Sequence, residues 1–216
     1  MRYDHIAWDF NGTILDDAAV SMAITNRLLR DRGLPEVPSL DEHFRHFGFP
    51  VEAYYARLGF DFTHETYAAV AAEWMVEYKS LTPTIPLCPG AREMIEAFSL
   101  ASIPQSILSA SEAGILRAQL ENHGVLAYFE EVVGREDVHA RSKEDAVLAW
   151  RERRQPGRVL MIGDNAHDAL CAQGAGFDCV LVCANAVARE RAVGCGCLVL
   201  SSLFELKEML QKEEML

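Results

Sequence analysis

Six short apolar segments, separated by stretches of helical character, constrain the fold of this chain more than any other feature. The segments span residues 5–8, 105–108, 131–133, 159–162, 179–183 and 198–200. Alternation of strands and helices produces βαβ units, in which consecutive strands run parallel and helices cover both faces of the sheet. The pattern therefore predicts an α/β fold with a doubly wound, Rossmann-like parallel sheet.

The segment of residues 17–83 interrupts this alternation. It shows helical character at residues 18–31, 40–47, 51–58 and 64–78, without a convincing strand. Prolines and a glycine between Pro83 and Gly90 mark the return to the sheet, because these residue types favour turns and helix starts. We therefore expect a discontinuous core domain of residues 1–16 and 84–216, with a helical domain inserted at residues 17–83.

The negative charge of the chain argues against polyanionic binding partners. The 216 residues carry a formal net charge of −12, which argues against binding to nucleic acid or to an anionic membrane surface. The sequence lacks both a run of about 18 apolar residues and a signal-peptide pattern, so we expect a cytoplasmic protein. Its oligomeric state is not indicated by any pattern in the sequence.

The six cysteines do not follow a disulfide or zinc-binding pattern. Most lie within apolar runs, and the pair Cys195-Gly196-Cys197 has no second cysteine or histidine cluster at regular spacing. We expect them to be reduced, structural thiols.

Polar residues follow three of the predicted strands, at the edge of the sheet where an open α/β fold binds ligands. They occupy residues 9–13, 109–111 and 163–168. Asp9 ends the first apolar strand in a position suited to a nucleophile, and Gly12 lets backbone amides approach an anion there. These segments form the candidate functional site.

Asp9, Asp164 and Asp168 bring three carboxylates to this edge, because Asp164 and Asp168 lie one helical turn apart. Close carboxylates repel one another and raise at least one pKa unless a cation is bound, so the cluster indicates a divalent ion such as Mg²⁺. Taken singly, each aspartate has a second interpretation as a helix cap, and Ser109 and Ser111 have one as helix starters.

In order and in context, these residues resemble the haloacid dehalogenase superfamily. Its four motifs are similar to Asp9-Phe10-Asn11-Gly12-Thr13-Ile14-Leu15-Asp16, Ser109, Lys143, and Gly163-Asp164 with Asp168. The phosphoglycolate phosphatase and β-phosphoglucomutase branch is similar in its helical cap after the first motif, in Tyr128-Phe129-Glu130 and in Val133-Gly134-Arg135-Glu136-Asp137. The resemblance covers nearly the whole chain.

The resemblance implies that the carboxylate of Asp9 attacks the phosphorus of a small phosphorylated metabolite. The resulting aspartyl-phosphate would then be hydrolysed by water. Mg²⁺ would be held by Asp9, the backbone carbonyl of Asn11 and Asp164, with Asp168 in or near the coordination shell.

The remaining motif residues would bind the substrate. Thr13, Ser109 and Lys143 would hold the oxygens of the transferring phosphoryl group. Gly12, next to Thr13, and Ala110, next to Ser109, are assigned to substrate binding. Substrate choice would lie in the cap, where Arg45 is the best candidate for a contact with a substrate anion.

Asn11 departs from the family pattern. Phosphatases and mutases of the family have an aspartate here, which protonates the leaving group and then activates water. An amide cannot exchange a proton near neutral pH, and general acid–base help is worth about 10² to 10⁴ in rate. We expect a phosphatase that acts on a good leaving group, or that borrows an acid such as Asp16, Asp17 or a cap residue.

Two alternatives stay open. A phosphonatase-like C–P hydrolase would need a Schiff-base lysine in the cap, where only Lys79 is available. A catalytically weak domain that binds a phosphorylated ligand or a partner protein would explain Asn11, but not the retained carboxylates, Ser109 and Lys143.

Overall fold

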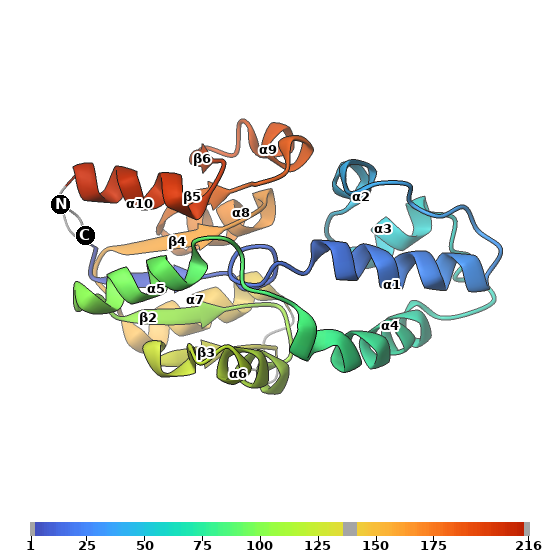
Figure 1. The fold of residues 1–216 in the computed structure, drawn as a ribbon, viewed down its shortest axis with the longest axis horizontal. Coiled ribbons are helices and arrows are strands. Elements are labelled where there is room, and N and C mark those ends of the chain that lie inside the picture. The colour runs from blue at the N-terminus through green and yellow to red at the C-terminus, as the bar shows by residue number, and fades with distance from the viewer. Residues whose placement is uncertain (1–2, 136–141, 214–216) are drawn as a thin grey trace. The chain divides into compact units, whose positions relative to one another are not determined.

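The structure, a computed structural model, describes residues 3–135 and 142–213. The chain forms two compact units, shown in Figure 1: Met1–Asp16 with Leu87–Leu216, here called the sheet unit, and Asp17–Pro86, the helical unit. No helix of the described residues is both long and apolar enough to span a membrane. Glu136 and Asp137, which contribute to the resemblance above, lie outside the described residues.

The sheet unit has six parallel strands within its described residues, in the order β3-β2-β1-β4-β5-β6. They are β1 (His5–Trp8), β2 (Gln105–Leu108), β3 (Glu131–Val133), β4 (Val159–Gly163), β5 (Asp178–Val182) and β6 (Leu198–Leu200). Every residue of β1, β2 and β4 is buried, as expected for parallel strands covered on both faces. The structure confirms the predicted α/β fold with its parallel sheet.

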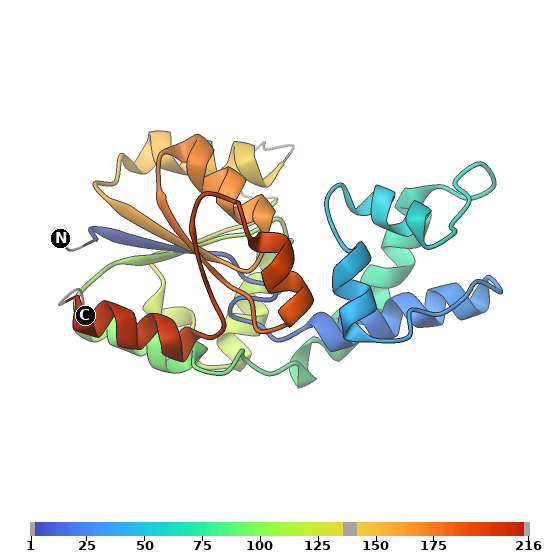
Figure 2. The same cartoon turned by 90° about the horizontal axis from the view of Figure 1, so that it is seen from above.

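Helices cover both faces of this sheet, as Figure 2 shows. They are α5 (Ala91–Leu100), α6 (Ala113–Asn122), α7 (Lys143–Arg154), α8 (Ala166–Ala175), α9 (Ala186–Ala192) and α10 (Leu203–Lys212), with a 3₁₀ turn at Leu126–Tyr128. Neighbouring strand residues point to opposite faces. Ala7 therefore packs in the cluster with Trp150 of α7 and Ala172 of α8, whereas Trp8 contacts Phe98 of α5.

The helical unit follows β1 after a loop of residues 9–16. It contains α1 (Ala18–Asp31), α2 (Leu40–His46), α3 (Val51–Arg57), α4 (Tyr67–Leu81) and a 3₁₀ turn at Thr82–Thr84. The last long helix starts three residues later than the sequence suggested, because the side chain of Thr66 caps it by accepting the backbone N–H of Ala69 at 3.2 Å. Tyr54 and Tyr55 lie in the unit's own hydrophobic core.

Candidate active site

The two central strands, β1 and β4, each lead into an aspartate at the carboxyl edge of the sheet. Trp8 is paired with Ile162, and the backbone N–H of Asp9 donates to the carbonyl of Ile162 at 2.8 Å. The chain crosses from β1 to β2 on one side and reaches β4 on the other, so this edge is the topological switch point of the sheet. Asp9 and Asp164 therefore lie where a doubly wound sheet binds its ligands.

Asp168 is held in place as part of a helix cap. Its Oδ2 accepts the backbone N–H groups of Asp164 at 3.1 Å and Asn165 at 3.2 Å. The side chain of Asn165 in turn caps the first turn of α8, which completes a capping box. The capping interpretation of Asp168 is therefore correct, and its other oxygen still faces Lys143.

Lys143 joins two of the carboxylates. It is the first residue of α7, yet its side chain is buried, with the residue only 5% exposed. Its Nζ donates to Oδ1 of Asp9 and, at 2.5 Å, to Oδ1 of Asp168. Charge-assisted bonds of this kind orient both carboxylates. The structure thus places the predicted lysine at the predicted aspartates.

The charges of this cluster are unbalanced. One carboxylate oxygen from each of Asp9, Asp164 and Asp168 lies within 4.8 Å of the others. Burial and the charge of Asp168 raise the pKa of Asp9 despite Lys143, and burial with both neighbouring carboxylates raises the pKa of Asp164. Burial lowers the pKa of Lys143, but the charges and hydrogen bonds of Asp168 and Asp9 outweigh burial and raise it.

A divalent cation fits this set of groups. Three ionised carboxylates and one ammonium leave two negative charges, which a doubly charged ion would neutralise. Carboxylate oxygens are hard ligands of the kind that Mg²⁺ prefers.

Two glycines lie against the carboxylates of Asp164 and Asp168. Gly12 has a φ of +79°, in the left-handed region, and a Cβ there would lie 2.8 Å from Cγ of Asp164. A Cβ on Gly163 would lie 2.5 Å from Cγ of Asp168. Both distances are shorter than heavy atoms tolerate, so a side chain at either position would displace the carboxylate that it meets.

Hydroxyl groups surround the same edge. Thr13 donates from Oγ1 to Oδ2 of Asp9 at 3.3 Å, and Ser109 is buried directly after β2. Ser111 belongs to the polar segment predicted at this edge, where the sequence also allows it as a helix starter. Its hydroxyl donates to Oδ1 of Asn11 at 2.8 Å, and its backbone N–H donates to Oγ of Ser109 at 3.2 Å. Ser111 therefore links the two loops and fixes the Asn11 amide.

Two of the residues assigned to substrate binding lack such a contact pattern. Ala110 is partly buried in the loop between Ser109 and Ser111. Arg45 lies on α2 in the helical unit, where its guanidinium donates to Glu42 and its side chain is 56% exposed. Both assignments stay predictions.

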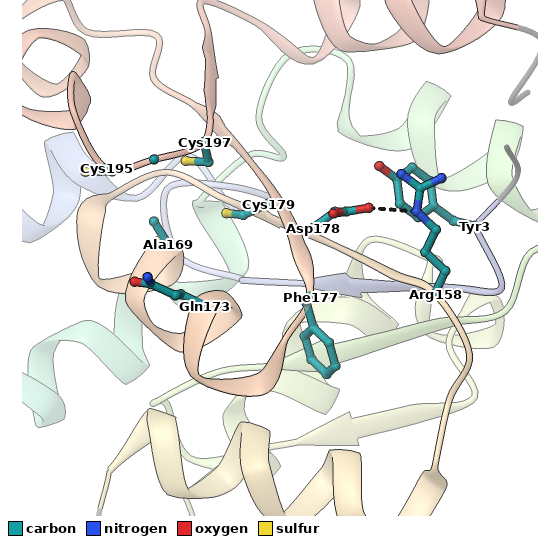
Figure 3. A pocket seen from close by; sticks show the side chains of 10 residues that line it. Tyr3, Arg158, Ala169, Gln173, Phe177, Asp178, Cys179, Cys195 and Cys197 are labelled. Atoms are coloured by element: carbon teal, nitrogen blue, oxygen red, sulfur yellow. Dashed lines mark hydrogen bonds and ion pairs between the residues drawn. The ribbon is translucent and has the colours of Figure 1, made fainter.

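A cavity of about 410 Å³ lies at the other end of the strands (Figure 3). Tyr3 and Arg158, which line it, precede β1 and β4, and Cys179 and Cys197 lie near the starts of β5 and β6. Arg158 stacks over the ring of Tyr3 and donates to Asp178 at 2.8 Å. Because the strands are parallel, this cavity is separate from the carboxylate cluster.

Comparison with known proteins identifies the family of the chain and agrees with its fold. The model of the haloacid dehalogenase-like hydrolase family matches residues 6–182, and the chain belongs to this family. A phosphoglycolate phosphatase from Photobacterium profundum is 35% identical over 92 residues, which cover 41% of this chain and 40% of that relative. One from Rhodobacter capsulatus is 27% identical over 183 residues and 82% of each chain.

Solved structures share the fold. A haloacid dehalogenase-like hydrolase from Streptococcus pneumoniae superposes with a TM-score of 0.82 at 18% identity, covering 97% of this chain and 99% of that one. The protein is thus a hydrolase similar to the phosphoglycolate phosphatases, with a helical insert between β1 and β2.

Proposed function

We propose that the protein is a Mg²⁺-dependent phosphatase that transfers the phosphoryl group of a small metabolite first to Asp9 and then to water. The observation that carries this proposal is the buried cluster at the switch point, in which Lys143 bonds both Asp9 and Asp168. Phosphoglycolate is the first substrate to test, because the curated relatives are phosphoglycolate phosphatases.

Asp9 is the proposed nucleophile. Its carboxylate would form a bond to phosphorus while the leaving-group oxygen departs with the bonding electron pair, giving a mixed anhydride. The hydrogen bonds from Thr13 and Lys143 hold the carboxylate in one orientation, which reduces the entropic cost of reaching the transition state. Asp164 is oriented by the side-chain amide of Asn165, which donates to its Oδ1 at 2.6 Å, whereas Asp9 is the strand-end carboxylate that Lys143 contacts.

The phosphoryl oxygens would be bound by Lys143 and Ser109. An ammonium group has three N–H donors, and the two carboxylates use two of them, which leaves the third for a phosphoryl oxygen. Mg²⁺, held by Asp9, the carbonyl of Asn11 and Asp164, with Asp168 close by, would supply charge stabilisation.

Asn11 sets the limit on turnover. Its amide is fixed by Ser111 but cannot donate a proton to a leaving group or take one from water. We expect slow hydrolysis of substrates with basic leaving groups. The amide at Asn11 also supports a second candidate function, a domain that binds a phosphorylated ligand with little turnover.

Phosphate release from phosphoglycolate and other phosphorylated metabolites tests the proposal. Wild type and Asp9→Asn should be purified in parallel and assayed with Mg²⁺ and with EDTA. We expect activity in the wild type with Mg²⁺, loss with EDTA, recovery on Mg²⁺ addition, and none in Asp9→Asn, whose fold should stay cooperative. Equal activity in the two proteins would exclude Asp9 as the nucleophile. Full activity in a verified metal-free sample would exclude the metal.

Binding without turnover distinguishes the second candidate. If the wild type binds phosphoglycolate in the presence of Mg²⁺ but releases no phosphate over many hours, the domain is a binding module. Restoration of turnover by Asn11→Asp would then identify Asn11 as the cause.

A further inference from the structure

A cluster of mixed metal ligands lies between α7 and α8, beside the carboxylate cluster but separate from it. We propose that Glu144, His167 and Cys171 form a second metal site, selective for Zn²⁺ or a similar borderline transition metal. One ligand atom from each of the three residues lies within 4.8 Å of the others. This inference is independent of the proposed phosphatase function.

The geometry comes from two packed helices. His167 and Cys171 are four positions apart on α8, so their side chains lie on the same face of that helix. Glu144 lies in the first turn of α7, and its Oε1 is 3.3 Å from Nδ1 of His167. Both helices belong to the sheet unit, and they pack against each other in its core.

Exposure is graded across the three side chains. The side chain of Glu144 is 41% exposed and that of His167 is 18% exposed, whereas Cys171 as a residue is 2% exposed. An ion arriving from solvent would therefore meet the carboxylate first, then the imidazole, and finally the sulfur. A buried sulfur with partly exposed partners provides an entry path as well as a desolvated ligand.

The donor atoms decide which metal this site would take. One oxygen, one nitrogen and one sulfur suit Zn²⁺, which accepts all three ligand types and commonly keeps water as a fourth ligand. The neighbouring aspartates offer only oxygen and suit Mg²⁺. The mixed cluster would therefore select Zn²⁺, and the carboxylate cluster would select Mg²⁺.

Cys171 also has a purely structural interpretation, because it packs with Ala7 and Trp150 in the apolar core. Core packing alone does not account for a carboxylate and an imidazole that converge near its sulfur. Burial raises the pKa of Cys171 to about 12, so the free thiol holds its proton at neutral pH. Metal binding would form the metal–sulfur bond and release that proton to solvent, and affinity should increase with pH.

Occupation would link the two helix starts that carry active-site residues. Glu144 directly follows Lys143, and His167 directly precedes Asp168. An ion between them would tie the first turns of α7 and α8 together and stabilise the sheet unit.

Titration with Co²⁺ provides the test, because a cobalt–thiolate bond produces a charge-transfer absorption in the near ultraviolet. The full chain, stripped of metal by chelation, is titrated with Co²⁺ in a large excess of Mg²⁺, which occupies the carboxylate cluster. We expect the absorption to saturate at one equivalent, to disappear when Zn²⁺ is added, and to be accompanied by a higher Tm with Zn²⁺. Absence of the absorption in the wild type would overturn the proposal.

Variants locate the thiolate. Cys171→Ser should abolish the absorption, and His167→Gln and Glu144→Gln, at more exposed positions, should each weaken Co²⁺ binding at least about tenfold. Cys88→Ser is the matched control in the same unit and should bind normally. Retention of the absorption in Cys171→Ser would overturn the proposal, as would unchanged binding in both of the other ligand variants.

A second group of thiols needs its own control. Cys179, Cys195 and Cys197 line the cavity of Figure 3. A variant with all three replaced by serine should still show the cobalt–thiolate absorption. Its loss in that variant, with Cys171 intact, would move the site to this group and refute the assignment to α7 and α8.

Discussion

Comparing two glycine-to-alanine variants, Gly12→Ala and Gly124→Ala, separates backbone strain from damage to the proposed metal site. The φ of +79° at Gly12 costs a residue with a Cβ roughly 1–2 kcal/mol. In addition, the new Cβ would lie 2.8 Å from Cγ of Asp164, so this carboxylate must move away. We therefore expect Gly12→Ala to lose stability and also to bind Mg²⁺ more weakly.

Gly124 provides the matched control. It follows α6 in the same unit, has a φ of +64°, and a Cβ there would meet nothing within 4 Å. Gly124→Ala should therefore show the same strain of roughly 1–2 kcal/mol without any effect on the carboxylates. The difference between the two variants isolates the contact with Asp164.

The expected difference can be worked out by linkage. At a Mg²⁺ concentration of 100 times the wild-type Kd, the ion stabilises the wild type by about 2.7 kcal/mol. If displacement of Asp164 weakens binding about tenfold, Gly12→Ala gains only about 1.4 kcal/mol. The stability gap between the two glycine variants should therefore widen by about 1.3 kcal/mol when Mg²⁺ is added.

Urea unfolding at a series of Mg²⁺ concentrations measures these quantities. The midpoint reports stability, and an unchanged m value shows that the unfolded states are comparable. Equal stabilisation of Gly12→Ala and Gly124→Ala by Mg²⁺ would refute the assignment of Asp164 as a metal ligand that depends on the space at Gly12.

Three further perturbations test a buried ion pair, the amide at position 11 and a buried histidine. Lys143→Met should destabilise the metal-free protein by about 3–5 kcal/mol in urea, because Asp9 and Asp168 lose their buried cation; a loss below about 1 kcal/mol would contradict the charge argument. Asn11→Asp should raise kcat/KM for alkyl phosphates by up to about 10² to 10⁴ and for aryl phosphates less; a parallel leaving-group dependence in both proteins would show that another residue supplies the proton. Burial lowers the pKa of His5 from 6.5 to about 4. As the pH falls, the unfolded chain therefore takes up the proton before the folded chain does. The free energy of unfolding is highest above pH 6.5 and decreases as the pH falls towards 4. Between pH 7.5 and 5 the wild type should lose about 2 kcal/mol more stability than His5→Gln, because His43, whose pKa burial also lowers to about 4, titrates in both proteins; equal pH dependence of the two proteins would contradict this.

Much of the sheet unit is predictable from local sequence. The strands are short apolar runs bounded by turn residues, and parallel strands must present their carboxyl ends at one edge, which places Asp9 and Asp164 together. The same rule indicated Ser109, which follows β2.

Contacts between distant segments were harder to predict. Taken alone, Lys143 has the sequence context of a solvated residue at a helix start. It is buried because it bonds two carboxylates, and these lie 134 and 25 residues away along the chain, beyond the reach of a local pattern. The bond from Ser111 to Asn11 spans 100 residues, and no local pattern encodes it. The pair of serines flanking Ala110 was the available signal, since two hydroxyls after a strand exceed what one helix cap requires.

The cluster of Glu144, His167 and Cys171 is also unpredictable from local sequence, because it joins residues from two distant segments. His167 and Cys171 have helical spacing that the sequence displays, but Glu144 joins them only through the packing of α7 on α8. The expectation that all six cysteines are reduced agrees with the structure, in which they are free thiols. Their purely structural role is the part that the proposed metal site would revise.

Direct detection of a phosphoryl group on Asp9 tests the proposed mechanism most closely. Asn11 cannot activate water for the second step, so the aspartyl-phosphate should accumulate when an aryl phosphate is the substrate. Wild type and Asp9→Asn are mixed with Mg²⁺ and substrate, quenched in acid within one turnover, and analysed by peptide mass spectrometry. We expect one phosphoryl group on the wild-type peptide containing Asp9, its decay over time, and none in the variant. Phosphate release by the wild type with no phosphoryl group on Asp9 at any quench time, and undiminished release by Asp9→Asn, would contradict the mechanism.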